Sequence, residues 1–131
     1  MTLAGRIHVA GAGVISAIGN SVEENLHSFR NNLSGIGGIT LFDSVHKGVL
    51  PVGEVKLSNK ELEIKLGTKR GLTRTALLGI HAAREAIRSS RIDVNKWRTG
   101  LISATTVGGM DKTEEFFDDF SSDSKKGRLR K

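Results

Sequence analysis

The chain has no cysteine and no tyrosine, one proline, one tryptophan and few aromatic residues (5%). Without cysteine it cannot form a disulfide, hold zinc through thiolates or use a thiol nucleophile. No window approaches 18 consecutive apolar residues, so we expect no membrane span and no membrane partner. The scarcity of aromatic residues leaves no pattern for stacking on bases. The 131 residues suffice for one ordinary domain, with a hydrophobic fraction of 37%.

The net charge of +6 is concentrated at one end of the chain. Residues 125–131 carry five of these charges, so the remainder is almost neutral. A basic tail of this kind could contact RNA or an acidic partner. We interpret residues 121–131 as a polar, basic tail or a truncated end, and we expect no nucleic-acid partner.

The order of apolar and polar residues predicts alternating strands and helices. Residues 6–12 read as a strand, and Ser21 and Glu24 match a capping box that begins a helix ending near 34–35. Residues 36–60 read as loop-like, with a short extended run from Val49 to Val55. A helix over 68–90, a buried strand over 99–107 and a helix over 110–120 follow. The alternation favours an α/β fold.

The sequence Gly11-Ala12-Gly13 raises the question of phosphate binding. The dinucleotide fingerprint fails, because Ser16 occupies its third glycine position and no acidic residue lies about 20 positions on. The predicted helix also begins several residues after Gly13. We therefore expect these glycines to permit close packing of backbone, and Gly13→Val to be strongly destabilising.

No residue pattern predicts a metal or cofactor site. The four histidines, His8, His27, His46 and His81, include no pair at metal-ligand spacing. The chain also lacks the G-x-S-x-G motif of a serine hydrolase. We expect surface or packing roles for the histidines, no metal and no cofactor.

Five stretches, in order, resemble the β-ketoacyl-acyl carrier protein synthases, the condensing enzymes of the thiolase-like superfamily. They are GAGVISAIGNSVEEN (11–25), LSGIGGITLFD (33–43), GEV (53–55), the alanine-rich stretch 70–92, and GLISATTVGGMDKTEEFF (100–117). Ala17 departs from the family, in which many members have a proline at this place. The resemblance implies that residues 1–120 are the N-terminal part of a thiolase-like layered fold, a mixed sheet with flanking helices, and that this fold is incomplete here.

The resemblance also implies a function for the whole enzyme. It would condense an acyl thioester with malonyl-carrier protein, in fatty acid or polyketide synthesis, using one cysteine and two histidines. None of these catalytic residues lies in this chain, so we expect the chain alone to be inactive. The family implies acyl carrier protein as partner, a homodimer or related heterodimer, and a cytoplasmic location.

Two groups of residues take candidate roles from the resemblance. Val107, Gly108, Gly109 and Met110 would lie along the acyl pocket near the dimer partner. Lys69, Arg70 and Arg74 would contact the acidic carrier protein. The sequence pattern around Val107 also fits an ordinary valine of the hydrophobic core, and a core position is compatible with a position along the acyl pocket.

Two other hypotheses remain open at the level of sequence. A non-catalytic partner of the chain-length-factor kind would share every motif and lack the downstream cysteine. A small independent binding module with a basic tail would instead fold as a compact monomer.

Overall fold

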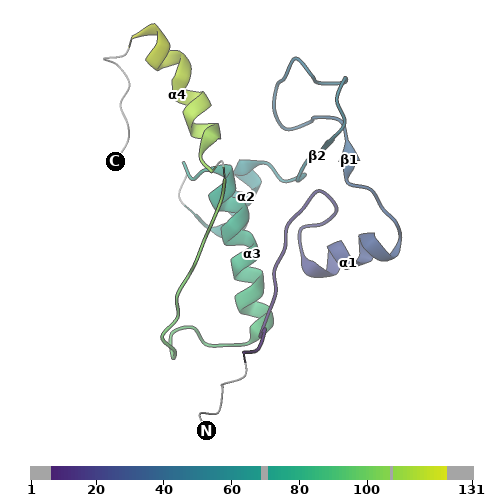
Figure 1. The fold of residues 1–131 in the computed structure, drawn as a ribbon, viewed down its shortest axis with the longest axis vertical. Helices are drawn as coiled ribbons and strands as arrows, with labels where there is room; N and C mark the ends of the chain where they lie inside the picture. The colour runs from purple at the N-terminus through teal and green to yellow at the C-terminus, as the bar shows by residue number, and fades with distance from the viewer. Residues whose placement is uncertain (1–6, 69–70, 107, 124–131) are drawn as a thin grey trace.

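The computed structural model describes residues 7–68, 71–106 and 108–123. Within them, four helices accompany a two-stranded antiparallel ladder (Figure 1). The helices are α1 (Val22–Arg30), α2 (Asn59–Leu66), α3 (Arg74–Ser90) and α4 (Met110–Ser122). Strands β1 (Ile36–Gly37) and β2 (Val52–Gly53) pair in the register Ile36 to Gly53 and Gly37 to Val52. The chain is thus a small α/β structure.

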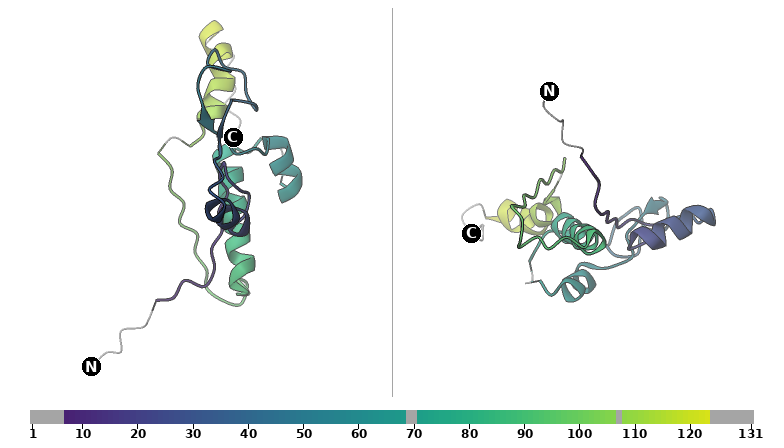
Figure 2. Two further views of the ribbon diagram at one scale, coloured as in Figure 1. Left: turned by 90° about the vertical axis from the view of Figure 1, so that its right-hand side faces the viewer. Right: turned by 90° about the horizontal axis from the view of Figure 1, so that it is seen from below.

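Helix α3 is the central element. Viewed from below, α1 and α4 lie on opposite sides of it and α2 on a third (Figure 2). The core is small and lies where α2 meets α3, with Leu62, Leu66 and Leu77 buried. Ile15, Leu57, Leu72, Leu78 and Ile80 pack around these three leucines.

The predictions of a loop over 36–60 and a helix over 68–90 are wrong in part. Residues 59–60 already belong to α2, a helix that was not predicted, and the second helix begins at Arg74. Ser58 and Glu61 make a complete capping box at the start of α2, and Gly67 ends it in the left-handed conformation (φ 59°). Thr73 then begins α3 by accepting a hydrogen bond from Ala76 N. The sequence signal that predicts α2 was therefore the serine–glutamate pair at 58 and 61.

Helix α1 begins as predicted but ends earlier. Ser21 is its N-cap, while the Glu24 carboxylate accepts from Asn20 N (2.6 Å), one residue before the cap. The helix ends at Arg30, and Asn32 then takes a left-handed conformation (φ 52°). The residues that α1 buries are Asn25 and Ser28, whereas Phe29 is 69% exposed.

The two longest predicted strands are not strands in the described residues. Residues 7–15 and 99–106 are extended without ladder partners, and Ile7 and Ile102 are almost fully exposed (99% and 98%). The physical reason is that a β-strand requires a neighbour for its N–H and C=O groups, and the described residues supply none there. The predicted helix over 110–120 is confirmed as α4.

The chain exposes much more surface than a compact protein. Its accessible surface is 11,358 Å². A compact protein of 14.1 kDa would expose about 6,700 Å². Large apolar side chains contribute to this excess on α1, α4 and both extended segments. No helix among the described residues is long and apolar enough to cross a membrane.

Candidate functional site

The Gly11–Gly13 stretch lies directly against the backbone of α3. A Cβ atom on Gly13 would overlap the carbonyl oxygen of Ala82 and lie 2.8 Å from Ala86 N. At Gly11 it would lie 2.7 Å from Ser90 N. The Ser89 hydroxyl accepts from Ala12 N and donates to Ala12 O, both at 3.1 Å. The expected steric role of these glycines is thereby confirmed, because glycine alone allows two backbones so close.

Glu85 ties three segments together, and no motif in the sequence predicted this. Its carboxylate accepts from Val14 N (2.9 Å) through one oxygen and from Val22 N (2.8 Å) through the other. A carboxylate from α3 thus binds both the extended N-terminal segment and the first turn of α1. Its negative charge there is favourable for the dipole of α1.

The turn before α4 meets the start of α3. Gly109 has a φ of 90°, and its carbonyl accepts from Lys112 N and Thr113 N in the first turn of α4. The Asp111 carboxylate accepts from Arg74 N at 2.8 Å. Of the expected acyl-pocket group, Gly108, Gly109 and Met110 therefore lie near the N-terminus of α3, with Met110 53% exposed. Val107 lies outside the described residues.

Arg74 is held by the connection between β2 and α2. Its guanidinium donates to Val55 O (2.9 Å), Leu57 O (3.0 Å) and Asn59 Oδ1 (2.9 Å). These bonds fix the entry into α2 relative to the first turn of α3. The other two residues of the expected carrier-protein group, Lys69 and Arg70, lie outside the described residues. The structure thus brings Arg74 and the turn at 108–110 together at one end of α3.

A cavity of about 280 Å³ opens beside Glu54. Its lining comprises Phe42, Val52, Gly53, Glu54, Val55, Arg74 and Leu78. Glu54 is buried and accepts from Thr40 Oγ1, Leu41 N and Thr40 N. The hydrogen bond from the Thr40 hydroxyl, with those from the Leu41 and Thr40 amides, lowers the pKa of Glu54 from 4.5 to about 2. The carboxylate therefore holds the long connection between β1 and β2 in place at neutral pH.

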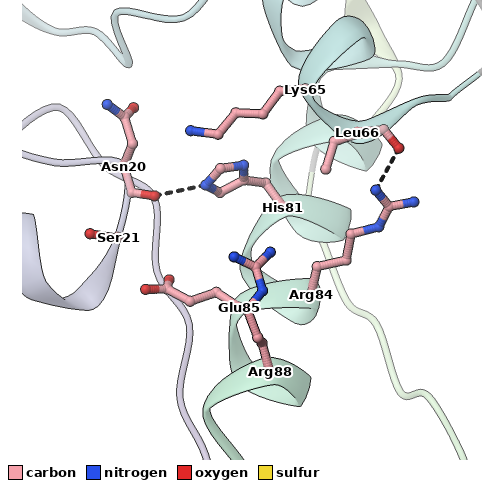
Figure 3. Close-up of a pocket in the computed structure, with 8 residues that line it drawn as sticks. All are labelled: Asn20, Ser21, Lys65, Leu66, His81, Arg84, Glu85 and Arg88. Carbon is pink, nitrogen blue, oxygen red and sulfur yellow. Dashed lines mark hydrogen bonds between the residues drawn. The ribbon is translucent and has the colours of Figure 1, made fainter.

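A basic pocket of about 150 Å³ lies between α1, α2 and α3 (Figure 3). Lys65, Arg84 and Arg88 line it from α2 and α3, together with Asn20, Ser21, Leu66, His81 and Glu85. The His81 ring is buried and donates from Nε2 to Asn20 O at 2.7 Å. Arg84 donates to Leu66 O at the C-terminal end of α2. Sequence reasoning missed this pocket because its residues are up to 68 positions apart.

The described residues hold no group of three or more metal-ligating side chains that could bind an ion. His81 is a buried packing residue with a backbone partner, which agrees with the expectation for it. His8, His27 and His46 are exposed.

Comparison with known proteins finds several relatives of one kind. The chain is 32% identical over 112 residues to 3-oxoacyl-[acyl-carrier-protein] synthase 2 of Staphylococcus aureus strain COL, a match covering 83% of the chain and 27% of that protein. It is 26% identical over 113 residues to the synthase of the same name from Synechocystis, covering 84% of the chain and 27% of that protein. No protein-family model matches, and no solved structure matches.

The similarity covers most of the chain and little of its relatives. The chain spans about a quarter of the length of the curated proteins it matches. The order of its five family-like stretches and this similarity agree with each other. The chain is a segment of the β-ketoacyl-acyl carrier protein synthase kind.

Proposed function

We propose that this chain is the scaffold and acyl-pocket portion of a β-ketoacyl-acyl carrier protein synthase. The observation that carries the proposal is the similarity to 3-oxoacyl-[acyl-carrier-protein] synthase 2 over 83% of the chain. In this proposal, residues 1–120 are the N-terminal part of a thiolase-like domain, and residues 121–131 are its polar continuation. The whole enzyme would act in the cytoplasm, as a homodimer or related heterodimer.

The arrangement of the two extended segments supports this proposal. Gly11 lies near Ala86 and Ser90, Gly13 near Ala82, and Ile15 packs on the leucine core, so residues 11–15 run toward the N-terminus of α3. Residues 91–109 must also return to that end, since Asp111 binds Arg74 N (Figure 1). Both segments therefore run in the same direction along one helix, as parallel strands do in a layered α/β fold.

The exposed apolar side chains provide a second line of support. Strand-forming residues such as Val9 and Ile102 stand in solvent, and so do Leu26 and Phe29 on α1. A sheet with helices on both faces would bury such residues. The excess of exposed surface suits part of a larger layer better than an independent binding module.

Condensation itself would use groups that this chain does not contain. The acyl chain would be carried on a cysteine, as in nucleophilic catalysis, and this sequence has none. Two histidines elsewhere in the enzyme would stabilise the developing oxyanion. The role of this chain is then to hold the scaffold and shape the pocket.

We assign the acyl pocket to Val107, Gly108, Gly109 and Met110. The positive φ of Gly109 produces a tight turn, after which Met110 presents a half-exposed thioether side chain. We assign carrier-protein contact to Lys69, Arg70 and Arg74. Because its guanidinium already donates to three acceptors, Arg74 would support this surface more than bind through it.

A chimera tests the proposal. Residues 6–117 would replace the corresponding segment of the Staphylococcus aureus synthase, and condensation of acyl thioesters with malonyl-carrier protein would be measured. We expect an active enzyme. A chimera that folds and dimerises but does not condense would refute the scaffold role.

Two variants of the chimera test the residue assignments. Val107→Trp should shorten the acyl chains accepted, whereas Val45→Trp, at an exposed loop position, should leave the length profile unchanged. Changing Lys69 and Arg70 to glutamate should raise KM for the carrier protein, with Lys60→Glu plus Arg98→Glu, at exposed positions, as the charge-matched control. An unchanged profile or KM would contradict the respective assignment.

A further inference from the structure

The basic pocket between α1, α2 and α3 has features of an anion site. Lys65 reaches it from the last turn of α2, and Arg84 and Arg88 reach it from successive turns of α3. Figure 3 shows the Lys65 ammonium, the His81 ring and the Arg88 guanidinium around one open space, with the Glu85 carboxylate beside it. Lys65 and Arg88 thus border one space together with a single carboxylate, whereas the Arg84 guanidinium is directed to Leu66 O.

The positive charge of this pocket is not neutralised by ion pairs. In the part of the chain that the structure describes, the ion pairs involve other lysines, and none includes Lys65, Arg84 or Arg88. The Glu85 carboxylate, whose two oxygens also accept from Val14 N and Val22 N, offsets one of the three positive charges, so the pocket keeps an excess of positive charge. Unpaired cations in a concave site raise the local concentration of anions.

The donors of the pocket suit a tetrahedral oxyanion. Arg88 offers a planar guanidinium that can bind two oxygens at once, and Lys65 offers a mobile ammonium. His81 borders the pocket and uses Nε2 on Asn20 O, which fixes the orientation of its ring. The pocket volume of about 150 Å³ is the volume that about five water molecules occupy in liquid water. A phosphate fits into a space of this size.

We propose that this pocket binds a phosphoryl group, either as inorganic phosphate or as the end of a phosphate monoester. The inference is independent of the condensing function, since none of the pocket residues belongs to the acyl-pocket or carrier-protein groups. Lys65 and Arg88 are the residues that bind the anion. Arg84, which also donates to Leu66 O, contributes charge and fixes the end of α2.

Calorimetric titration of the full chain with inorganic phosphate tests this proposal, at constant ionic strength set with chloride. A parallel titration uses glycerol 3-phosphate as the monoester. We expect saturable binding of at least one of them, and no comparable binding of acetate. Binding of glycerol 3-phosphate more tightly than phosphate would identify the monoester as the ligand, and the reverse order would identify the free ion.

Paired variants locate the binding. Lys65→Gln with Arg88→Gln should weaken phosphate binding at least tenfold. Lys60→Gln with Arg98→Gln removes the same charge at exposed positions outside the pocket and should change the affinity less than twofold. Circular dichroism would verify that both double variants keep their helices. The proposal is overturned if neither phosphate nor glycerol 3-phosphate binds better than acetate, or if both double variants bind the ligand equally.

Discussion

Gly13→Ala is the smallest change that tests how the N-terminal segment packs on α3. The added Cβ would overlap the Ala82 carbonyl oxygen and lie 2.8 Å from Ala86 N and 2.9 Å from Ala82 C. All three atoms belong to the backbone of a helix, which cannot shift locally as a flexible side chain could. The segment must therefore move away from α3 or remain overpacked.

Each of these responses has a cost that the structure defines. Overpacking costs about 1–3 kcal/mol. Movement instead weakens the bond from Val14 N to the charged Glu85, worth about 1.5–3 kcal/mol, and the two bonds between Ala12 and Ser89. The loss of glycine freedom in the unfolded chain returns about 0.4–1 kcal/mol. We expect a net destabilisation of about 1–2 kcal/mol, with a larger loss for Gly13→Val.

Urea unfolding followed by circular dichroism at 222 nm measures this loss. The matched control is Gly37→Ala, because a Cβ there would have no atom within 4 Å. We expect the midpoint of Gly37→Ala to equal or slightly exceed that of the unchanged chain. A Gly13→Ala midpoint equal to that of the control would refute the close packing of the segment on α3.

Four further outcomes are expected. Gly79→Ala, in α3 with no atom within 4 Å of the added Cβ, should stabilise the chain by about 1 kcal/mol in the same urea assay. The pKa of Glu54 is lowered to about 2, so its contribution to the free energy of unfolding is full above pH 4.5 and is lost as the pH falls toward 2. The urea midpoints of the unchanged chain and Glu54→Gln should therefore differ at pH 7 and converge below pH 4.5. The chain alone should accept no acyl group from acyl carrier protein in a gel-shift assay, since it lacks cysteine, and detectable transfer would contradict this. Light scattering with size exclusion should show concentration-dependent self-association driven by the exposed apolar side chains, whereas a sharp monomer at all concentrations would favour an independent module.

The sequence by itself determined the local signals and the family. Ser21, Ser58 and Thr73 are the N-caps of three helices, and each accepts from a nearby backbone N–H within its own segment. Such interactions span three residues, so a local pattern can reveal them without a tertiary structure; the sequence analysis predicted the cap at Ser21 but not those at Ser58 and Thr73. The order of the family-like stretches is likewise a property of the sequence, and the similarity to the synthases agrees with it.

Only the tertiary structure decided which surfaces meet. Residues 6–12 have a strand pattern, but pairing depends on a neighbour, and here Gly11 and Gly13 lie against α3 instead. Glu85 lies 71 positions from Val14 and 63 from Val22, so no local pattern could reveal that it joins them. The basic pocket arises for the same reason, since Lys65 and Arg88 converge only when α2 folds back on α3. Such long-range contacts are set by the packing of whole elements, which the spacing of residues along one element does not determine.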